Sequence, residues 1–418
     1  MDHIALGRQL RSARERRGLS QQTVADAVGL PRTAVTLVES GQRQVSTAEL
    51  TRFAELHGMS ISELLSPNEP QDDPLVVLYR LAPQMGNDPK IKALVERCLD
   101  LCKIGIELEA ALGREASLGP PSFPVSPPQN AGAAITQGTE VADEERRRLG
   151  LGYAPIRDIC SRITEQGVWA AITPLDTNMS GFFMHHPKIG LVVIANSSHR
   201  PSRRRFSFAH EYGHALMDRD LRVQITSTTN ADELIEKRAN AFAAAFLLPA
   251  KGVEHFLMSI GKGRTSRQQQ AVYDVASNGR FDVETRSAPN SQRITYQDVA
   301  SLAQSYGVSY EATTYRLHNL GHMDWSTMQE LLAKSPLANQ YLRLLRVQND
   351  DVFRSQNGDA EAEFPSENGP ELRSQILGLG MEAFRREEIS RGRLLEIGKR
   401  LDIPGSILID LVEAERSI

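Results

Sequence analysis

The segment that most constrains the fold is His-Glu-Tyr-Gly-His at residues 210–214, which lies inside a helical pattern of apolar residues. Two histidines four residues apart share one face of a helix, about 6 Å from each other, so both imidazoles can reach one metal ion. Glu211 follows the first histidine and could accept a proton from a metal-activated water without binding the metal. A segment of this kind arises by chance in a chain this long about once in a hundred, so a third ligand is needed.

A second helical pattern downstream offers that ligand. Residues 233–248 have helical periodicity and end at Pro249, and the acids at the start are Asp232, Glu233 and Glu236. A glutamate on a helix packed against the first would complete a tetrahedral site, with the fourth position open to water. Spacing alone does not choose among these acids. The alternative is a structural zinc site or a site that no longer cleaves. Structural sites usually have four Cys or His ligands, which favours the open, catalytic type.

Two stretches around these residues resemble the ImmA/IrrE family of zinc peptidases: R-R-F-S-F-A-H-E-Y-G-H at 204–214 and E-K-R-A-N-A-F-A-A-A-F-L-L-P at 236–249. The resemblance implies that Glu211 is the general base and that Zn²⁺ is bound by His210, His214 and Glu236. The preceding hydrophobic strand, which ends at Asn196, also fits the family's layout. No oxyanion-stabilising residue is identified. Candidates for substrate-binding or supporting roles are His199, Arg203 and the pair His185-His186, although ordinary polar residues are the plainer interpretation of each.

The first seventy residues contain short helices separated by helix-ending signals. Ser20 is an N-cap for a helix over 21–28, Gly29 and Leu30 form a turn, and Pro31 fits the first position of the next helix. Two helices joined by a tight turn of this kind form a helix-turn-helix, whose second helix enters the major groove of DNA.

The stretch LSQQTVADAVGLPRTAVTLVESGQRQVSTAELTRFAELHGMSISELL at 19–65 resembles the XRE (phage-repressor-like) family. The resemblance implies a partner, double-stranded operator DNA, with base-edge contacts from Arg32, Thr33 and Thr36. It also implies residues near the phosphates, which are Gln21, Gln42 and Arg43. Arginine can bind guanine through two hydrogen bonds, and exposed amides and hydroxyls can anchor the DNA backbone. The alternative is a protein-interaction bundle that has lost its affinity for DNA.

Composition limits the other possibilities. The 48 Lys and Arg residues against 52 Asp and Glu leave a formal net charge of −4, so overall charge does not indicate nucleic-acid binding. No run approaches the ~18 uncharged apolar residues of a membrane-spanning helix, and the start lacks the apolar stretch of a secretory signal. Three cysteines cannot form a disulfide framework. These features predict a cytoplasmic protein that does not associate with membranes.

Residues 88–112 carry an apolar stripe with alternating steps of three and four residues: Ile91, Leu94, Cys98, Leu101, Gly105, Leu108 and Leu112. Such a stripe is typical of the core face of a helical bundle, or of a coiled-coil seam about three repeats long. A homodimer through this seam would suit DNA half-sites related by two-fold symmetry. The stretch that follows is rich in Pro, Gly and Ala and predicts a flexible linker.

Together these patterns predict a mainly α-helical α+β protein with a small β-sheet. The predicted organisation is a five-helix helix-turn-helix domain at 1–70, a helical spacer at 71–113, a flexible linker at 114–139, a zincin-like peptidase domain at 140–325 with an exposed insert at 261–295, and a helical region at 326–418. The expected function is a DNA-binding transcription regulator with a zinc-dependent endopeptidase that cleaves a repressor-type protein or itself. The alternative is a DNA-binding regulator or antitoxin-like protein whose peptidase fold is catalytically inert and serves in sensing or docking.

Overall fold

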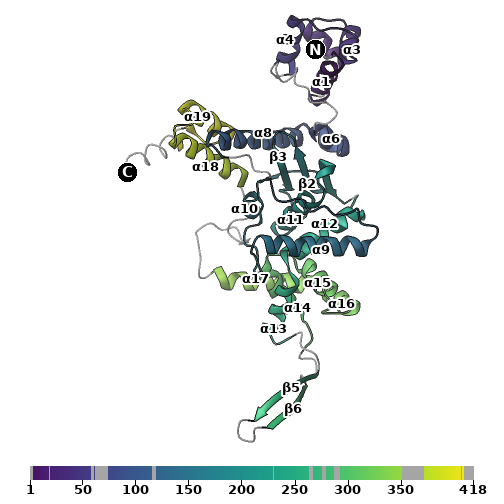
Figure 1. Cartoon of the computed structure of the whole chain (residues 1–418), viewed down its shortest axis with the longest axis vertical. Helices are drawn as coiled ribbons and strands as arrows, with labels where there is room; N and C mark the ends of the chain where they lie inside the picture. The colour runs from purple at the N-terminus through teal and green to yellow at the C-terminus, as the bar shows by residue number, and fades with distance from the viewer. Residues whose placement is uncertain are drawn as a thin grey trace. The chain divides into compact units, whose positions relative to one another are not determined.

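The computed structural model of the chain describes residues 3–17, 19–57, 61, 74–114, 119–228, 230–262, 267–274, 279–286, 292–350, 371–405 and 407–408. The chain divides into two compact units, Met1–Lys92 and Ala93–Ile418, each with its own hydrophobic core. Helices dominate, and the second unit contains a four-stranded sheet, so the predicted α+β class is confirmed (Figure 1).

The first unit begins with four helices around an apolar core: α1 (His3–Arg16), α2 (Gln21–Val28), α3 (Arg32–Glu39) and α4 (Thr47–His57). The Ser20 side chain caps α2 by accepting a hydrogen bond from Thr23 N, and Gly29 ends the helix in the left-handed conformation, with φ 69°. The tight turn from Gly29 to Pro31 confirms the predicted helix-turn-helix. Helices α6 (Pro74–Leu81) and α7 (Pro83–Asn87) follow.

The second unit is built around a mixed sheet with strand order β1-β3-β2-β4. β1 (Val168–Thr173) runs parallel to β3 (Gly190–Asn196), and β2 (Met179–His186) is antiparallel to both β3 and β4 (Val223–Ser227). β3 is buried from Leu191 to Asn196, so both faces of this central strand are covered. β4 forms one edge of the sheet.

Three helices pack together beside this sheet. α11 (Pro201–Met217) contacts β2 and β3, and α12 (Leu234–Leu247) contacts both α11 and α9 (Ala131–Arg148), as Figure 1 shows. The buried aromatic rings of Tyr212, Phe242 and Phe246 lie between α11 and α12. α10 (Ile159–Thr164) contacts β1, and the short η2 (Arg219–Leu221) leads from α11 to β4. The packing holds α11 and α12 side by side.

A second core lies beyond α12. It is formed by residues of α13 (Ala250–Ser259), α14 (Tyr296–Tyr306), α15 (Tyr310–Asn319), α16 (Trp325–Ala333) and α17 (Ser335–Asp350). Between α13 and α14, the predicted insert contains an antiparallel hairpin of β5 (Arg267–Asp274) and β6 (Gly279–Arg286). Helices α18 (Glu371–Arg385) and α19 (Arg391–Arg400) pack against each other.

The apolar stripe predicted at 88–112 lies on α8 (Pro89–Ala111) and is used within the chain. Leu101, Gly105 and Leu108 are buried, and a Cβ at Gly105 would lie 2.3 Å from the Trp169 ring and 2.7 Å from the Ile376 side chain. The stripe is therefore the core face of a bundle that packs on β1 and α18, as one of the two interpretations predicted. Homodimerisation through this seam stays a prediction.

The predicted linker over 114–139 is wrong in its second half. Residues 131–139 form the first half of α9, which Asn130 caps by accepting a hydrogen bond from Ala133 N. The glycine at 138 permits close packing of helices: a Cβ there would lie 2.2 Å from the Arg238 carbonyl oxygen and 2.9 Å from the Phe242 nitrogen. Small residues in this stretch therefore reflect a tight α9–α12 interface and not flexibility.

Replacing Gly138 by alanine should destabilise the second unit by about 1–3 kcal/mol, because the backbone of α12 cannot yield to the added methyl group. The matched control is Gly378→Ala in α18, where an added Cβ meets nothing within 4 Å. That change should stabilise the chain by about 0.5–1 kcal/mol, because alanine loses less backbone entropy in a helix. Urea unfolding of both variants measures the difference, and equal effects would contradict the proposed contact.

No single described helix is long and apolar enough to cross a membrane. The pair α12 and α13, bent by 41°, passes the test of length and composition. Both helices carry residues of the two cores, including Phe242, Phe246 and Val253.

Candidate metal centre

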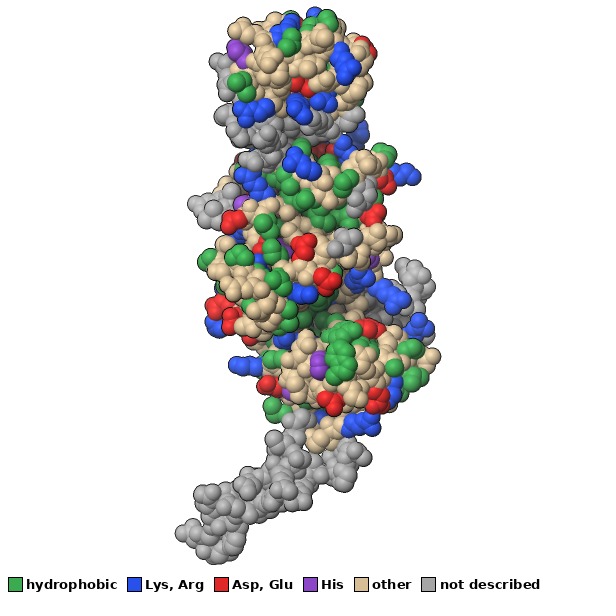
Figure 2. Space-filling view, turned by 90° about the vertical axis from the view of Figure 1, so that its right-hand side faces the viewer, with side chains coloured by type: hydrophobic (Ala, Val, Ile, Leu, Met, Phe, Trp, Pro, Cys, Tyr) green, Lys and Arg blue, Asp and Glu red, His purple; other side chains and the backbone are tan. Residues whose placement is uncertain are grey.

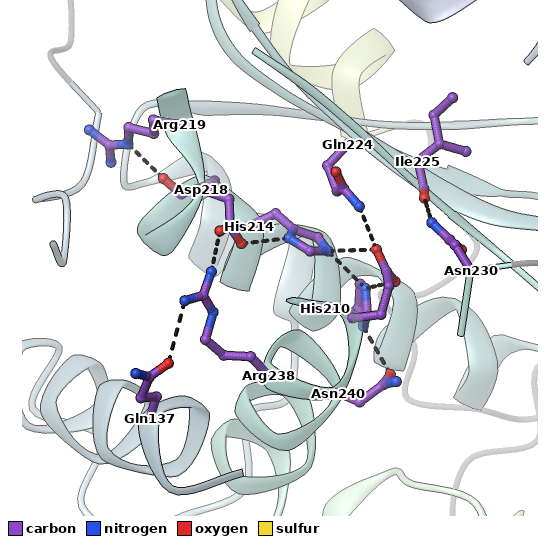
Figure 3. Close-up of polar contacts among 12 residues, drawn as sticks. Gln137, His210, His214, Asp218, Arg219, Gln224, Ile225, Asn230, Arg238 and Asn240 are labelled. Carbon is purple, nitrogen blue, oxygen red and sulfur yellow. Dashed lines mark hydrogen bonds and ion pairs between the residues drawn. The ribbon is translucent and has the colours of Figure 1, made fainter. Parts of the chain in front are cut away.

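Three side chains from two helices converge at one point in the second unit. His210 Nε2 lies 3.1 Å from His214 Nε2 and 3.1 Å from Glu236 Oε2, and His214 Nε2 lies 3.5 Å from Glu236 Oε1. All three side chains are buried. Figure 3 shows the imidazoles of His210 and His214 of α11 directed toward each other, and both contact the Glu236 carboxylate of α12. The structure therefore brings together the two histidines predicted from spacing and the glutamate implied by the family resemblance, with potential ligand atoms within 4.8 Å of one another.

The close approach of α11 to α12 depends on a small residue within the histidine segment. A Cβ at Gly213 would lie 2.9 Å from the Phe242 ring. Phe242 in turn stacks on Phe246, with ring centroids 5.2 Å apart. A larger residue at 213 would push α12 away and carry Glu236 with it.

Oxygen acceptors hold both imidazoles by the nitrogen that faces away from the cluster. His210 Nδ1 lies 3.0 Å from Asn240 Oδ1, and His214 Nδ1 lies 2.8 Å from Asp218 Oδ2. Because these oxygens can only accept, each Nδ1 carries a proton, and Nε2 is the nitrogen that each ring would offer to a cation. Two Nε2 atoms and a carboxylate thus face one another. This donor set fits a divalent cation.

A further chain of contacts leads from this site to α9. The Arg238 guanidinium donates to Asp218 Oδ1 and, at 3.4 Å, to Gln137 Oε1, as drawn in Figure 3. On the other side, Gln224 Nε2 of β4 donates to Glu236 Oε1 at 2.7 Å. Sequence reasoning missed these supporting residues. Asp218 lies one helical turn after His214, and this spacing could have identified it. Nothing in the sequence pattern indicated Gln224, which reaches the site from a strand.

Charges within the cluster are strongly coupled. Burial lowers the pKa of His214, but hydrogen bonds to Asp218 and Glu236 outweigh it and raise that pKa to about 10. Burial would raise the pKa of Glu236, yet hydrogen bonds to His210 and His214 hold it well below its usual range. Burial lowers the pKa of His210. The Glu236 carboxylate thus stabilises positive charge on the imidazoles. A cation bound at the cluster would take the place of the proton that gives His214 this charge.

Glu211 lies beside the cluster but outside its hydrogen-bond network. Its side chain is completely buried, and neither carboxylate oxygen has a hydrogen-bond partner among the described residues. Gly181 of β2 makes room for it, because a Cβ there would lie 3.1 Å from Glu211 Oε1. Burial raises the pKa of Glu211 to about 8, and this outweighs the opposite effects of the nearby His214 and of the Thr226 hydroxyl of β4. Burial of a carboxyl group without a hydrogen-bond partner destabilises the folded state. Its presence here therefore indicates a catalytic role and not a role in packing.

Asp218 should set the affinity for metal through the orientation of His214. The Asp218→Asn variant loses the carboxylate that holds the imidazole, and we expect its zinc affinity to fall by about 10–100-fold. Competition with a chromophoric chelator measures the affinity. Asp220→Asn is the control, because Asp220 is exposed in the adjacent η2 and should leave the affinity unchanged. An unchanged affinity in Asp218→Asn would show that the contact does not support the site.

Comparison with protein families identifies one domain within each unit. Residues 163–266 match the IrrE N-terminal-like domain, and residues 5–65 match a helix-turn-helix domain. This chain joins a helix-turn-helix domain to an IrrE-like domain. The family resemblances seen in both halves of the sequence are thereby confirmed.

Curated relatives match one domain or the other. The radiation response metalloprotease IrrE of Deinococcus deserti is 31% identical over 174 residues, which cover 40% of this chain and 59% of that protein. IrrE of Deinococcus radiodurans is 29% identical over 187 residues, which cover 42% of this chain and 54% of that protein. The HTH-type transcriptional regulator PuuR of Escherichia coli is 32% identical over 75 residues, or 18% of this chain and 40% of PuuR. The chain thus spans little more than half the length of the first two relatives.

The IrrE-like domain has a cavity of about 280 Å³ at the metal cluster. His210 and Glu236 line it, together with residues of β2, β4 and the amino-terminal half of α11. The full lining is Ser180, Arg203, Phe206, Ser207, His210, Thr226, Ser227, Thr228, Ala231, Glu236 and Asn240. The cavity therefore extends to two of the three candidate ligands, which are themselves almost fully buried.

The helix-turn-helix domain presents the predicted DNA-contacting residues on and around α3. Arg32, Thr33 and Thr36 are exposed on this helix, and Gln42 is exposed just after it. Two other predicted contacts are engaged within the domain. Gln21 accepts a hydrogen bond from Thr36 Oγ1 at 3.2 Å and donates to Glu39 at 2.8 Å, and Arg43 pairs with Glu49 at 2.7 Å. Roles for these six residues in DNA binding stay predictions.

Proposed function

We propose that this chain is a DNA-binding transcription regulator whose IrrE-like domain is a zinc-dependent endopeptidase. The observation that carries the proposal is the convergence of two imidazole nitrogens and the Glu236 carboxylate within 4.8 Å, beside the buried Glu211. The match to the IrrE N-terminal-like domain and the two relatives named as metalloproteases support it.

Zinc is the metal that suits these donors best. His210, His214 and Glu236 would hold it, in the combination of two nitrogens and one carboxylate oxygen found in catalytic zinc sites. When bound there, zinc supplies Lewis-acid activation of a water molecule and of a peptide carbonyl. A fourth position then remains for water or substrate, on the side where His210 and Glu236 line the cavity.

Glu211 is the proposed general base. Its carboxylate would accept a proton from the attacking water and pass it to the nitrogen of the leaving amine. Burial raises the pKa of this carboxyl to about 8 in the chain without a cation, and the positive charge of a bound cation would lower that pKa and favour the carboxylate form that accepts the proton. Asp218, Asn240 and Gln224 would keep the three ligands in their orientation.

An extended peptide is the substrate shape that the cavity favours. β4 is an edge strand, and Thr226, Ser227 and the adjoining Thr228 line the cavity. Backbone groups along a strand edge can bind an added strand through main-chain hydrogen bonds. On β4 the Asn230 side chain already donates to Ile225 O at 2.6 Å and accepts from Ser227 N at 3.0 Å, so a bound peptide would replace these two contacts. A peptide aligned on β4 would pass the candidate metal ligands. This arrangement favours hydrolysis of a flexible or locally unfolded segment of a protein.

The proposed substrate is a repressor-type protein that carries a helix-turn-helix domain, or this chain itself. Cleavage of a separate protein is the simpler case. Within the segment predicted as the linker, residues 131–139 are helical, and Phe123 N donates to Leu216 O at 2.8 Å while Phe123 and Val125 pack on the core. Cleavage within 119–139 would first require this segment to detach. A homodimer and a cytoplasmic location also remain predictions.

Zinc loading of the purified full-length chain tests the peptidase proposal. We expect about one zinc per chain after removal of metal by a chelator and reloading, measured by atomic emission. We also expect zinc-dependent cleavage of repressor-type proteins encoded by neighbouring genes, observed as defined fragments in mass spectrometry. The same incubation with the chelated protein is the control. Stoichiometric zinc without cleavage would favour the inert metal-binding alternative.

Loss of the exposed polar side chains of α3 should weaken sequence-specific DNA binding. Figure 2 shows more basic than acidic side chains on the visible face of the first unit. For Arg32→Ala with Thr36→Ala we expect at least about a tenfold loss of affinity, because each base contact contributes about 1–3 kcal/mol. Gel shifts with duplexes selected from a random library measure it. Arg52→Ala with Thr51→Ala, the same residue types on α4, is the control. Equal binding by both double variants would remove α3 as the recognition helix.

A further inference from the structure

One face of α11 lines the cavity from the amino-terminal part of the helix to the metal cluster. Arg203, Phe206, Ser207 and His210 all line it, at relative positions of zero, three, four and seven residues. This is the spacing of residues on one helix face. Arg203 precedes His210 by about two turns, which is a rise of about 10 Å along the helix axis. The cavity therefore connects the candidate metal ligands with a cationic side chain.

The Arg203 guanidinium can donate several hydrogen bonds, and one is found among the described residues. It donates to Ser180 Oγ of β2 at 3.2 Å, and it makes no ion pair with any residue that the structure describes. Other arginines of this helix differ: Arg204 donates to two backbone carbonyls, and Arg205 is buried and donates to Ile156 O and Arg157 O. The hydrogen bond to Ser180 fixes one nitrogen of the Arg203 guanidinium, and the remaining N–H groups can donate to a ligand.

The electrostatics of the cavity favour an anionic group near Arg203. Glu236 is the single acid among the described residues that line it, and His210, His214 and Gln224 already contact that carboxylate. The rest of the lining is neutral, with hydroxyl groups from Ser180, Ser207 and Thr226 among others. The amino-terminal end of α11 adds partial positive charge at the same end of the cavity. A cation at the metal cluster would increase the positive potential further.

We propose that Arg203 is a specificity-determining residue, which selects peptides with an aspartate or glutamate two or three residues from the scissile bond. This inference rests on the proposed function, because the metal cluster defines where the scissile bond lies. An extended peptide rises about 3.4 Å per residue, so a distance of about 10 Å corresponds to three residues, and the length of the arginine side chain can shorten it to two. A carboxylate at that position can accept two parallel hydrogen bonds from the guanidinium fork.

Peptide hydroxamates test the selection without any need for hydrolysis. The probes are acyl-tripeptide hydroxamates that carry either glutamate or glutamine at the first, second or third residue from the metal-binding group. Their binding to the zinc-loaded full-length chain is measured by calorimetry. We expect the glutamate form to bind about fivefold more tightly at the second or third position, the scale of a partly exposed ion pair. Arg203→Gln should reduce the preference to less than twofold, and Arg203→Glu should reverse it, so that the glutamine form binds more tightly.

Arg200→Gln is the matched control. Arg200 is exposed at the start of the same helix and does not line the cavity, so its loss removes one nearby charge and should keep the preference for glutamate. Equal binding of both probe forms by the wild-type chain, a preference that survives in Arg203→Gln, or no binding of any hydroxamate would each overturn the inference. Zinc-dependent cleavage with equal probe binding would leave the peptidase proposal standing. A glutamate preference without cleavage would leave the selection standing and remove the peptidase.

Discussion

We expect the Glu211→Gln variant to bind zinc like the wild-type chain and to hydrolyse peptides at least about 100-fold more slowly, the usual contribution of a general base. Glutamine keeps the size of the side chain but cannot accept and return a proton. The fold should tolerate the change, because the carboxylate makes no hydrogen bond within the described chain that glutamine would lose. Initial rates of fragment formation, together with zinc stoichiometry on the same samples, measure the effect.

Glu233→Gln is the matched control for this experiment. Glu233 is exposed at the N-cap of α12, so the same chemical change is made three residues before the candidate ligand. Its activity should equal that of the wild-type chain. Unaltered hydrolysis in Glu211→Gln would exclude the residue as the base. Unaltered regulation in cells by an inactive Glu211→Gln chain would instead favour the alternative in which the IrrE-like domain serves in sensing or docking.

The second large effect concerns the ligand contributed by α12. Glu236→Gln should weaken zinc binding by at least about 100-fold, more than the loss of a supporting contact does. The amide keeps one neutral oxygen but loses the charge that stabilises a cation among His210, His214 and Gln224. Competition with a chelator of known affinity measures the dissociation constant, and circular dichroism checks that the helices persist.

Glu233→Gln again serves as the control, and here it also tests which of two acids is the ligand. The spacing of acids at the start of α12 left Glu233 and Glu236 as rival ligands, and the structure directs Glu236 into the cluster while Glu233 is exposed. A loss of zinc affinity in Glu233→Gln, with Glu236→Gln unaffected, would contradict the site as described. Loss in neither variant would show that the two histidines bind metal with some other partner.

Part of the site could be anticipated because it depends on local geometry. A spacing of four residues places His210 and His214 on one face of α11, whatever the rest of the fold does. The same argument reaches Asp218, one turn further, and Asn240, one turn after Glu236. The choice of Glu236 came from the family resemblance, since two acids three residues apart on one helix are equivalent by spacing.

The linker over 114–139 shows where composition misleads. Glycine and alanine are common in flexible segments, but the same small residues allow two helices to approach closely. At 138 the missing side chain lets α9 contact the backbone of α12. The partner helix lies about a hundred residues further along the chain, so no local pattern could distinguish the two cases.

Elements with local causes could be predicted from the amino-acid sequence: the capped helices and tight turn of the helix-turn-helix domain, and the helix that carries two histidines and an adjacent glutamate. Which groups meet depended on the packing of distant segments. This packing brought Glu236 and Gln224 to the imidazoles from another helix and from a strand, left Glu211 buried without a partner, and placed Arg203 in the same cavity. The physical reason is that helix and turn formation depend on neighbours in the chain, whereas burial, cavities and charge pairing depend on segments that packing brings together.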